Sequence, residues 1–191
     1  MESIQILSVL LLIYEVVASC TEPRHDQQYF CRAQNAFTAY VDDVTGPPGD
    51  PFDRTYAVTV RRVYKGTNVS PNTTTTLYGR STSCGPTILD LKKYYKIYAR
   101  TNGPRLEIIS HEEIPPAFEG RIKMYDCSCQ IEIHATRSSN SISYEDDTNK
   151  CIVTTSGRDC QFRNGYCKKT NNLCTWKLFP RAQRTMNCIR H

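Results

Sequence analysis

All ten cysteines of this 191-residue chain lie at or after position 20, and this placement constrains its fold more than any other feature. The preceding residues 4–17 are mostly apolar, and Val17 and Ser19 place small side chains at the −3 and −1 positions of a cut before Cys20. Such a segment is typical of a secretory signal peptide. An even number of cysteines in an exported chain of this size indicates a disulfide framework. We therefore predict that residues 1–19 are a signal peptide and that the mature chain, secreted to the extracellular space, begins at Cys20.

The N-terminal stretch allows two other interpretations. It could be a buried N-terminal helix, and Val17-Ala18-Ser19-Cys20 also resembles the lipobox of bacterial lipoproteins, which would acylate Cys20. No Lys or Arg precedes the apolar run, and the density of later cysteines also speaks against a lipoprotein. Glu15 interrupts the run, which is short for a membrane helix. No other apolar run of membrane length follows, so we predict no membrane span.

The charge pattern limits the classes of partner. The formal net charge is +5, but the basic residues are scattered and meet only in pairs such as Arg61-Arg62 and Lys92-Lys93. This pattern argues against a nucleic-acid partner. An excess of positive charge suits adhesion to acidic extracellular matrix polysaccharide, and the alternative is that it only keeps the protein soluble.

Two glycosylation sequons stand close together in a Thr-rich stretch. Asn68 and Asn72 head these sequons, and Pro71 makes the first one the poorer acceptor. We predict a glycoprotein, which agrees with secretion.

The chain from residue 20 to about residue 106 has the pattern of short strands. Apolar side chains alternate with polar ones in four segments, and turn-forming residues separate the segments. The alternating positions are Phe37, Ala39 and Val41; Tyr56, Val58 and Val60; Tyr95, Ile97 and Ala99; and Leu106 and Ile108. Several short strands joined by turns predict a small antiparallel barrel or sandwich.

The pattern changes after residue 110. Phe118, Ile122 and Tyr125 follow a helical spacing after Pro115-Pro116, which predicts one amphipathic helix ending near Cys127. Beyond Cys129 the chain is rich in Ser, Asn and Cys. A segment of this composition has little core of its own and depends on disulfides.

Short motifs spread along the chain resemble those of one family. They occur in order between residues 20 and 176: Cys20-Thr21-Glu22-Pro23, the run from His25 to Phe30-Cys31, Tyr64-Lys65-Gly66, Ser83-Cys84-Gly85, the strand from Tyr94 to Ala99, Cys127-Ser128-Cys129, and Cys174-Thr175-Trp176. Their order and spacing resemble the tissue inhibitors of metalloproteinases.

The resemblance implies a fold and a division of the chain. The fold would be mainly β, with a five-stranded, OB-fold-like (netrin-like) barrel, a flanking helix and a small disulfide-rich C-terminal subdomain. The inhibitory domain would span residues 20–127 and the C-terminal subdomain residues 128–191.

The resemblance also implies a mechanism. The free α-amino group and carbonyl of Cys20 would chelate the catalytic zinc of a metalloproteinase, whose open coordination position normally holds water. Thr21 would enter the specificity pocket of the protease, and Glu22 and Pro23 would continue along its cleft. The loop Ser81-Thr82-Ser83-Cys84 would also contact the protease. The chain would then be a monomeric protease inhibitor and not an enzyme, with no cofactor of its own and zinc shared with the inhibited protease.

The resemblance implies most of the disulfide pairing as well. Cys20–Cys84 and Cys31–Cys127 would lie in the barrel domain, and Cys129–Cys174 in the C-terminal part. Cys151–Cys167 is a looser match, and Cys160–Cys188 is left as the fifth pair.

Two positions depart from the family together. The family has a disulfide where this chain has Glu22 and the residue His111 that follows Leu106-Glu107-Ile108-Ile109-Ser110. We expect Glu22 and His111 to be neighbours, with the carboxylate raising the pKa of the histidine. One residue is also missing between Cys20 and His25 relative to the family pattern.

Two other functions remain as alternatives. The chain could be a non-inhibitory secreted netrin-like module for binding or immunomodulation, and a residue retained ahead of Cys20 would favour it. A secreted hydrolase is the third class, but Pro115 occupies the place of the second His in the zincin-like run from His111. We expect His25 to cap or to pack against the barrel rather than to bind a metal.

Overall fold

The computed structural model describes residues 24–46, 54–82, 85–115, 121–136, 142–156 and 160–179. The described chain is mainly β and falls into two compact units. We call the described residues 34–115 the barrel unit, and residues 24–33 together with 121–179 the disulfide unit. The predicted domain limit between residues 127 and 128 stays a prediction. The described residues 24–33, which precede the barrel in the sequence, belong to the same unit as the C-terminal part of the chain.

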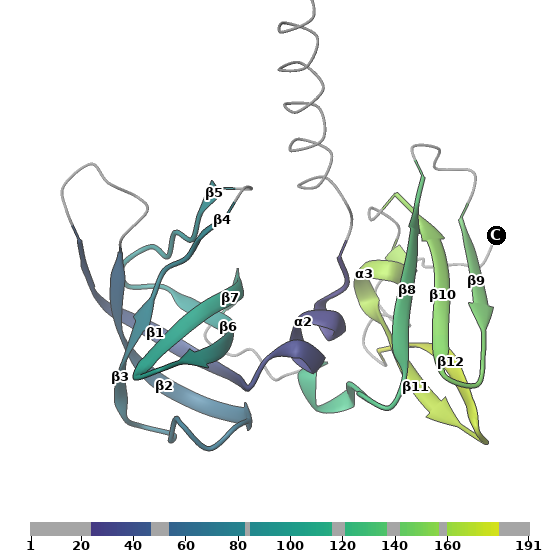
Figure 1. The fold of residues 1–191 in the computed structure, drawn as a ribbon, viewed down its shortest axis with the longest axis horizontal. Coiled ribbons are helices and arrows are strands. Elements are labelled where there is room, and N and C mark those ends of the chain that lie inside the picture. Colours follow the sequence, from purple (N-terminus) through teal and green to yellow (C-terminus); the bar gives the residue numbers. More distant parts are fainter. Residues whose placement is uncertain are drawn as a thin grey trace, which may run out of the picture. The chain divides into compact units, whose positions relative to one another are not determined.

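The barrel unit is a closed sheet of five strands (Figure 1). In chain order these strands are β1 (Asn35–Thr45), β2 (Thr55–Lys65), β3 (Thr74–Tyr78), β6 (Tyr94–Asn102) and β7 (Arg105–Glu113). Around the barrel the order is β1-β2-β3-β7-β6. All neighbours are antiparallel except β3 and β7, which run parallel and meet at Tyr78 and Glu107.

The alternating apolar residues of these strands fill the barrel. Each strand has a side-chain period of two, so one set of alternate residues faces the interior. The buried cluster contains all the predicted inward positions, namely Phe37, Ala39, Val41, Tyr56, Val58, Val60, Tyr95, Ile97, Ala99, Leu106 and Ile108. The prediction of a mainly β fold with these inward residues is confirmed. The prediction of a purely antiparallel sheet is corrected, because β3 and β7 run parallel.

Gly66 ends β2 because no other residue fits its place. Its φ is +95°, a conformation that residues with a Cβ avoid. A Cβ there would lie 2.3 Å from Oδ1 of Asn35 and 2.7 Å from the carbonyl oxygen of Gln34. The turn after Tyr64-Lys65 therefore requires a glycine, which gives a physical reason for this motif.

The disulfide unit contains short helices and two small sheets (Figure 1). Its helical elements are α2 (Asp26–Arg32), the 3₁₀ helix η1 (Arg121–Met124) and α3 (Cys160–Asn164). Strand β10 (Lys150–Thr155) lies between β8 (Gln130–Ala135), to which it is parallel, and β9 (Ser143–Asp146), to which it is antiparallel. Strands β11 (Gly165–Thr170) and β12 (Leu173–Leu178) form a hairpin.

The helix prediction for residues 118–127 is corrected in its described part. Residues 121–124 form a single 3₁₀ turn rather than the amphipathic helix, while residues 116–120 lie outside the described residues. Ile122 is buried, as its spacing implied. The longer helix α2 was not predicted, because its buried residue is Gln27 and no apolar stripe marks it.

Candidate functional site: the loop and the helix beside the predicted inhibitory residues

The structure describes only the borders of the predicted inhibitory contact. Cys20, Thr21, Glu22, Pro23, Ser83 and Cys84 lie outside the described residues, and so does the predicted Cys20–Cys84 disulfide. Ser81–Thr82 forms strand β4, which pairs with β5 (Gly85–Pro86) through Ser81 with Pro86 and Thr82 with Gly85. Two described segments lie next to these residues in the sequence, the β4–β5 loop in the barrel unit and helix α2 in the disulfide unit, and each is described by itself.

The β4–β5 loop is fixed at its base by a tyrosine from the barrel. Tyr56 is fully buried, and its hydroxyl donates to the carbonyl oxygen of Thr87 at 2.8 Å. The same hydroxyl accepts from the backbone N–H of Leu89 at 3.3 Å. Because both backbone groups lie after β5, Tyr56 holds one end of the segment that carries Ser81 and Thr82.

Backbone contacts hold the other end of this loop. The N–H and the hydroxyl of Thr87 both donate to the carbonyl oxygen of Arg80, at 3.0 and 3.1 Å. The N–H of Gly79 donates to the carbonyl oxygen of Arg54 at 2.8 Å. The two flanks of β4 and β5 are thus joined to each other and to β2. Sequence reasoning had no signal for this role of Tyr56, because its place in the strand alternation indicated only a core residue.

Burial determines the titration of His111, and the prediction of a raised pKa is wrong. Burial lowers the pKa of the His111 imidazole, and a hydrogen bond with the backbone of Ile88 opposes this in part. The ring also lies edge-on to Tyr95, with 5.8 Å between centroids. Burial outweighs the other effects because a charged imidazole loses water there. The predicted neighbour Glu22 lies outside the described residues.

His25 begins helix α2 as a cap. Its Nδ1 accepts from the N–H of Gln27 at 3.2 Å, and its own N–H donates to Oε1 of Gln28 at 3.0 Å. The expected capping role is confirmed. The expected packing against the barrel is corrected, since the ring lies 5.1 Å from the rings of both Phe162 and Trp176 in the disulfide unit.

Three disulfides lie within the described residues. Cys31 is bonded to Cys127, Cys129 to Cys174 and Cys151 to Cys167. These are three of the five pairs given in the sequence analysis. The pairing of Cys160 and Cys188 cannot be followed, because Cys188 lies outside the described residues.

Two of these disulfides form the core of the disulfide unit. Cys129, Cys151, Cys167 and Cys174 are buried together, with Ile131 and Trp176 packed against them. The sulfurs of Cys129, Cys167 and Cys174 lie within 4.8 Å of one another, a spacing that would suit a metal if they were thiolates. All three are oxidised in disulfides, so this cluster is structural.

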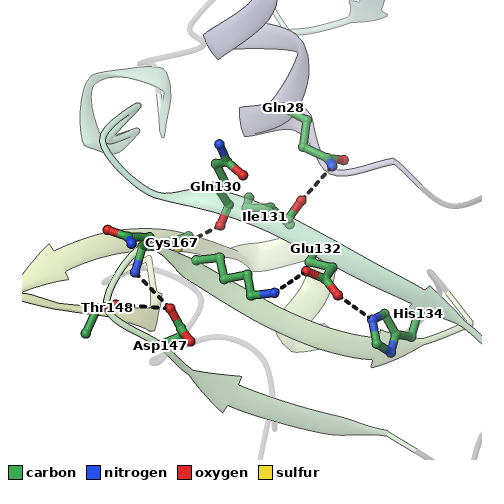
Figure 2. A network of polar contacts seen from close by, with 10 residues as sticks. Gln28, Gln130, Ile131, Glu132, His134, Asp147, Thr148 and Cys167 are labelled. Atoms are coloured by element: carbon green, nitrogen blue, oxygen red, sulfur yellow. Dashed lines mark hydrogen bonds and ion pairs between the residues drawn. The ribbon is translucent and has the colours of Figure 1, made fainter.

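Polar contacts along β8 join it to α2 and β10 (Figure 2). Nε2 of Gln28 donates to the carbonyl oxygen of Ile131 at 3.0 Å. Glu132 lies between Nζ of Lys150 at 2.6 Å and Nε2 of His134 at 2.8 Å. These contacts lower the pKa of Glu132, with the hydrogen bond from Lys150 as the largest cause. β8 is therefore linked through side chains to the helix that follows the predicted inhibitory residues.

The barrel unit also has an open depression. It is lined by Lys92, Lys93, Tyr94, Glu113, Ile114 and Pro115. Nζ of Lys93 lies 2.8 Å from Glu113 and 2.9 Å from Asp90, and these carboxylates raise the pKa of its ammonium group. Two carboxylates therefore neutralise the charge of Lys93 at this depression.

Both predicted glycosylation residues are exposed in the segment between β2 and β3. Nδ2 of Asn68 donates to Oγ1 of Thr101 at 2.7 Å, whereas Asn72 occupies a turn with a φ of 60°. The nitrogen that would carry a glycan is thus already engaged at Asn68, which agrees with the choice of Asn72 as the better acceptor.

No family model matches this chain, and no curated protein is significantly similar to it. In the described part of the chain, no helix is both long and apolar enough to cross a membrane.

Proposed function

We propose that this protein is a secreted inhibitor of zinc metalloendopeptidases whose inhibitory group is the N-terminal Cys20. The proposal rests on the ordered motifs that resemble the tissue inhibitors of metalloproteinases. The observation that supports it best is the Cys31–Cys127 disulfide, with 5.4 Å between its Cα atoms. This bond joins the segment after the predicted inhibitory residues to the Cys-x-Cys motif, as the resemblance implies.

The topology of the barrel supports the finer fold assignment within this proposal. The third strand of the barrel, β3, neighbours the fifth, β7, in parallel, and the fourth, β6, closes the sheet on β1. A closed five-stranded barrel with crossed connections is compatible with an OB-fold of the netrin-like type. We propose this fold for residues 34–115.

The proposed chemistry requires a free amine at Cys20. A neutral α-amine, with a reference pKa of about 7.7–8.0, and its own carbonyl oxygen can occupy a catalytic zinc as two ligands and displace the bound water. The Cys20–Cys84 disulfide would keep the thiol from the zinc and hold the amine beside the β4–β5 loop. Such pre-organisation lowers the entropy lost on binding.

A non-inhibitory secreted binding module is the second candidate. It is favoured by the replacement of one family disulfide by Glu22 and His111, which leaves the N-terminal segment with one covalent tie fewer. The mature N-terminus separates the two candidates, since any residue ahead of Cys20 blocks the chelating amine.

The test combines N-terminal sequencing of the secreted protein with inhibition assays against zinc endopeptidases and one serine endopeptidase. The proposal predicts a mature chain that begins at Cys20 and inhibits a zinc enzyme but not the serine enzyme. A chain that begins at Cys20 and inhibits none of a broad panel of zinc endopeptidases would contradict it.

A further inference from the structure

Four buried cysteines from four segments of the disulfide unit meet at one place. Cys129 precedes β8, Cys151 lies in β10, Cys167 in β11 and Cys174 in β12 (Figure 1). Each is at most 4% exposed. The sulfurs of Cys129, Cys167 and Cys174 lie within 4.8 Å of one another, and Cys151 is bonded to Cys167. We call these four residues the four-cysteine cluster.

The cluster brings together sulfurs that belong to two different disulfides. Cys129 is bonded to Cys174, and Cys167 is bonded to Cys151. Four thiolates bound to one zinc at about 2.3 Å in a tetrahedron lie about 3.8 Å apart. Three sulfurs that are already within 4.8 Å of one another are close to this spacing. Once both disulfides are opened, small rotations of the cysteine side chains therefore suffice to place four sulfurs around a metal.

The surroundings of the cluster suit a buried metal. Ile131 and Trp176 pack against it, so its sulfurs are shielded from water. The disulfide unit depends on the cross-links between these segments, because a segment of its composition buries little apolar surface. Reduction removes these cross-links. A metal bound by all four thiolates would join the same four segments again, and its binding free energy would then contribute to folding.

We propose that the four-cysteine cluster is a redox-controlled zinc site, which binds one Zn²⁺ through four thiolates when its two disulfides are reduced. Zinc takes four sulfur ligands in tetrahedral structural sites and has no redox chemistry of its own. Thiol reductants supply four electrons and four protons to the two disulfides and are themselves left as disulfides. Zn²⁺ then displaces the protons of the four thiols. This inference goes beyond the proposed function and does not rest on it.

The oxidised and the zinc-bound states exclude each other, because a sulfur in a disulfide is not a thiolate. Oxidation by a disulfide-forming oxidant removes four electrons from the bound thiolates, closes the two disulfides and releases Zn²⁺. The same four segments are thus cross-linked in both states, once by two disulfides and once by the metal. The redox state of the surroundings determines which cross-link is present.

The test uses the full-length protein, reduced without oxygen by a phosphine, which takes up the oxygen of water as each disulfide opens. Two double variants are compared with wild type. Cys129→Ser/Cys174→Ser removes one disulfide of the cluster. Cys31→Ser/Cys127→Ser is the matched control, because it removes the described disulfide of the same unit that lies outside the cluster. Thiols elsewhere in the chain are identical in the two variants, so any metal that they bind is common to both.

Each protein is titrated with Co²⁺, whose visible spectrum reports tetrahedral thiolate coordination, and then with Zn²⁺. Reduced wild type and Cys31→Ser/Cys127→Ser should each bind one Co²⁺ tetrahedrally and exchange it for Zn²⁺. Loss of ligands costs at least as much as loss of the groups that orient them, so Cys129→Ser/Cys174→Ser should bind Zn²⁺ at least about a hundredfold more weakly. Zinc affinities of the two double variants within about threefold of each other would overturn the proposal.

Hydrogen exchange shows whether the metal organises the unit. Zn²⁺ should slow exchange in β10, β11 and β12 at least about tenfold in reduced wild type and in the control, but not in Cys129→Ser/Cys174→Ser. Exchange in the barrel strands, which have an apolar core of their own, should not respond to Zn²⁺. Exchange in β10–β12 of reduced wild type that is unchanged by Zn²⁺ would contradict the site, and so would equally tight Zn²⁺ binding by the oxidised protein.

Discussion

At the scale of single residues, two polar side chains set properties that the strand pattern does not reveal. Tyr56 looks like a core residue by its alternation, and its ring is one, yet its hydroxyl is the anchor of the β4–β5 loop. His111 stands where a family disulfide is missing, and burial governs its pKa. Sequence shows which residue occupies each place, but hydroxyl partners and burial depend on how strands meet.

We expect Tyr56→Phe to destabilise the barrel by about 1–3 kcal/mol, because the carbonyl oxygen of Thr87 and the N–H of Leu89 lose a buried partner. On the proposed function, inhibition should also weaken. The matched control is Tyr94→Phe, which removes only a 3.4 Å contact with Arg61 at the surface. Its stability should stay within about 0.5 kcal/mol of wild type by urea unfolding. Equal stability of the two variants would contradict the anchoring role.

The lowered pKa of His111 predicts a loss of stability on acidification. An unfolded histidine titrates near 6.5. Because the folded pKa lies below this value, the unfolded chain binds more protons in this range. The stability that neutral His111 contributes at neutral pH is therefore lost as the pH drops from about 6.5 through the folded pKa. Urea unfolding at pH 7.5 and 5.5 should show a smaller acid-induced loss for His111→Gln than for wild type. A larger loss in the variant would mean that the pKa is raised.

At the scale of secondary structure, an element could be predicted from the sequence when it buries an apolar face. The barrel strands do so with a period of two, and their inward residues could be predicted from the sequence. Helix α2 buries Gln27 and is recognised only by its cap, in which the His25 side chain accepts from the N–H of Gln27 and the His25 N–H donates to the Gln28 side chain. The parallel pairing of β8 with β10 joins segments separated by a strand, and no local pattern encodes it.

The turn after β2 offers a test of the barrel geometry. We expect Gly66→Ala to destabilise the protein by at least about 3 kcal/mol, since the added Cβ meets Asn35 and the backbone of Gln34 in addition to the left-handed strain. Gly103→Ala is the control. Its φ is +56° and no atom lies within 4 Å of an added Cβ, so only a strain of about 1 kcal/mol applies. Similar unfolding free energies for the two variants would contradict the close contact of Gly66 with Asn35 and the backbone of Gln34.

At the scale of the whole molecule, the chain joins a barrel with an apolar core to a unit built around disulfides. Composition indicated this contrast, because the segment after Cys129 is rich in cysteine and poor in apolar residues. Composition did not indicate that residues 24–33 belong with that segment, since the hydrogen bonds of Gln27 to Asp126 and Cys167 span 99 and 140 residues of sequence. The predicted inhibitory residues lie next to this helix in sequence and outside the described residues.

The most direct test of the account compares the mature protein with a form that carries one extra alanine before Cys20. Both forms should give the same circular dichroism spectrum and melting temperature, because one added alanine leaves every described core residue of the sequence unchanged. The account predicts that the protein with the free Cys20 amine inhibits a zinc endopeptidase and that the extended form loses at least about a hundredfold in inhibition constant, since a blocked amine cannot serve as a zinc ligand. Full potency in the extended form would contradict chelation by Cys20.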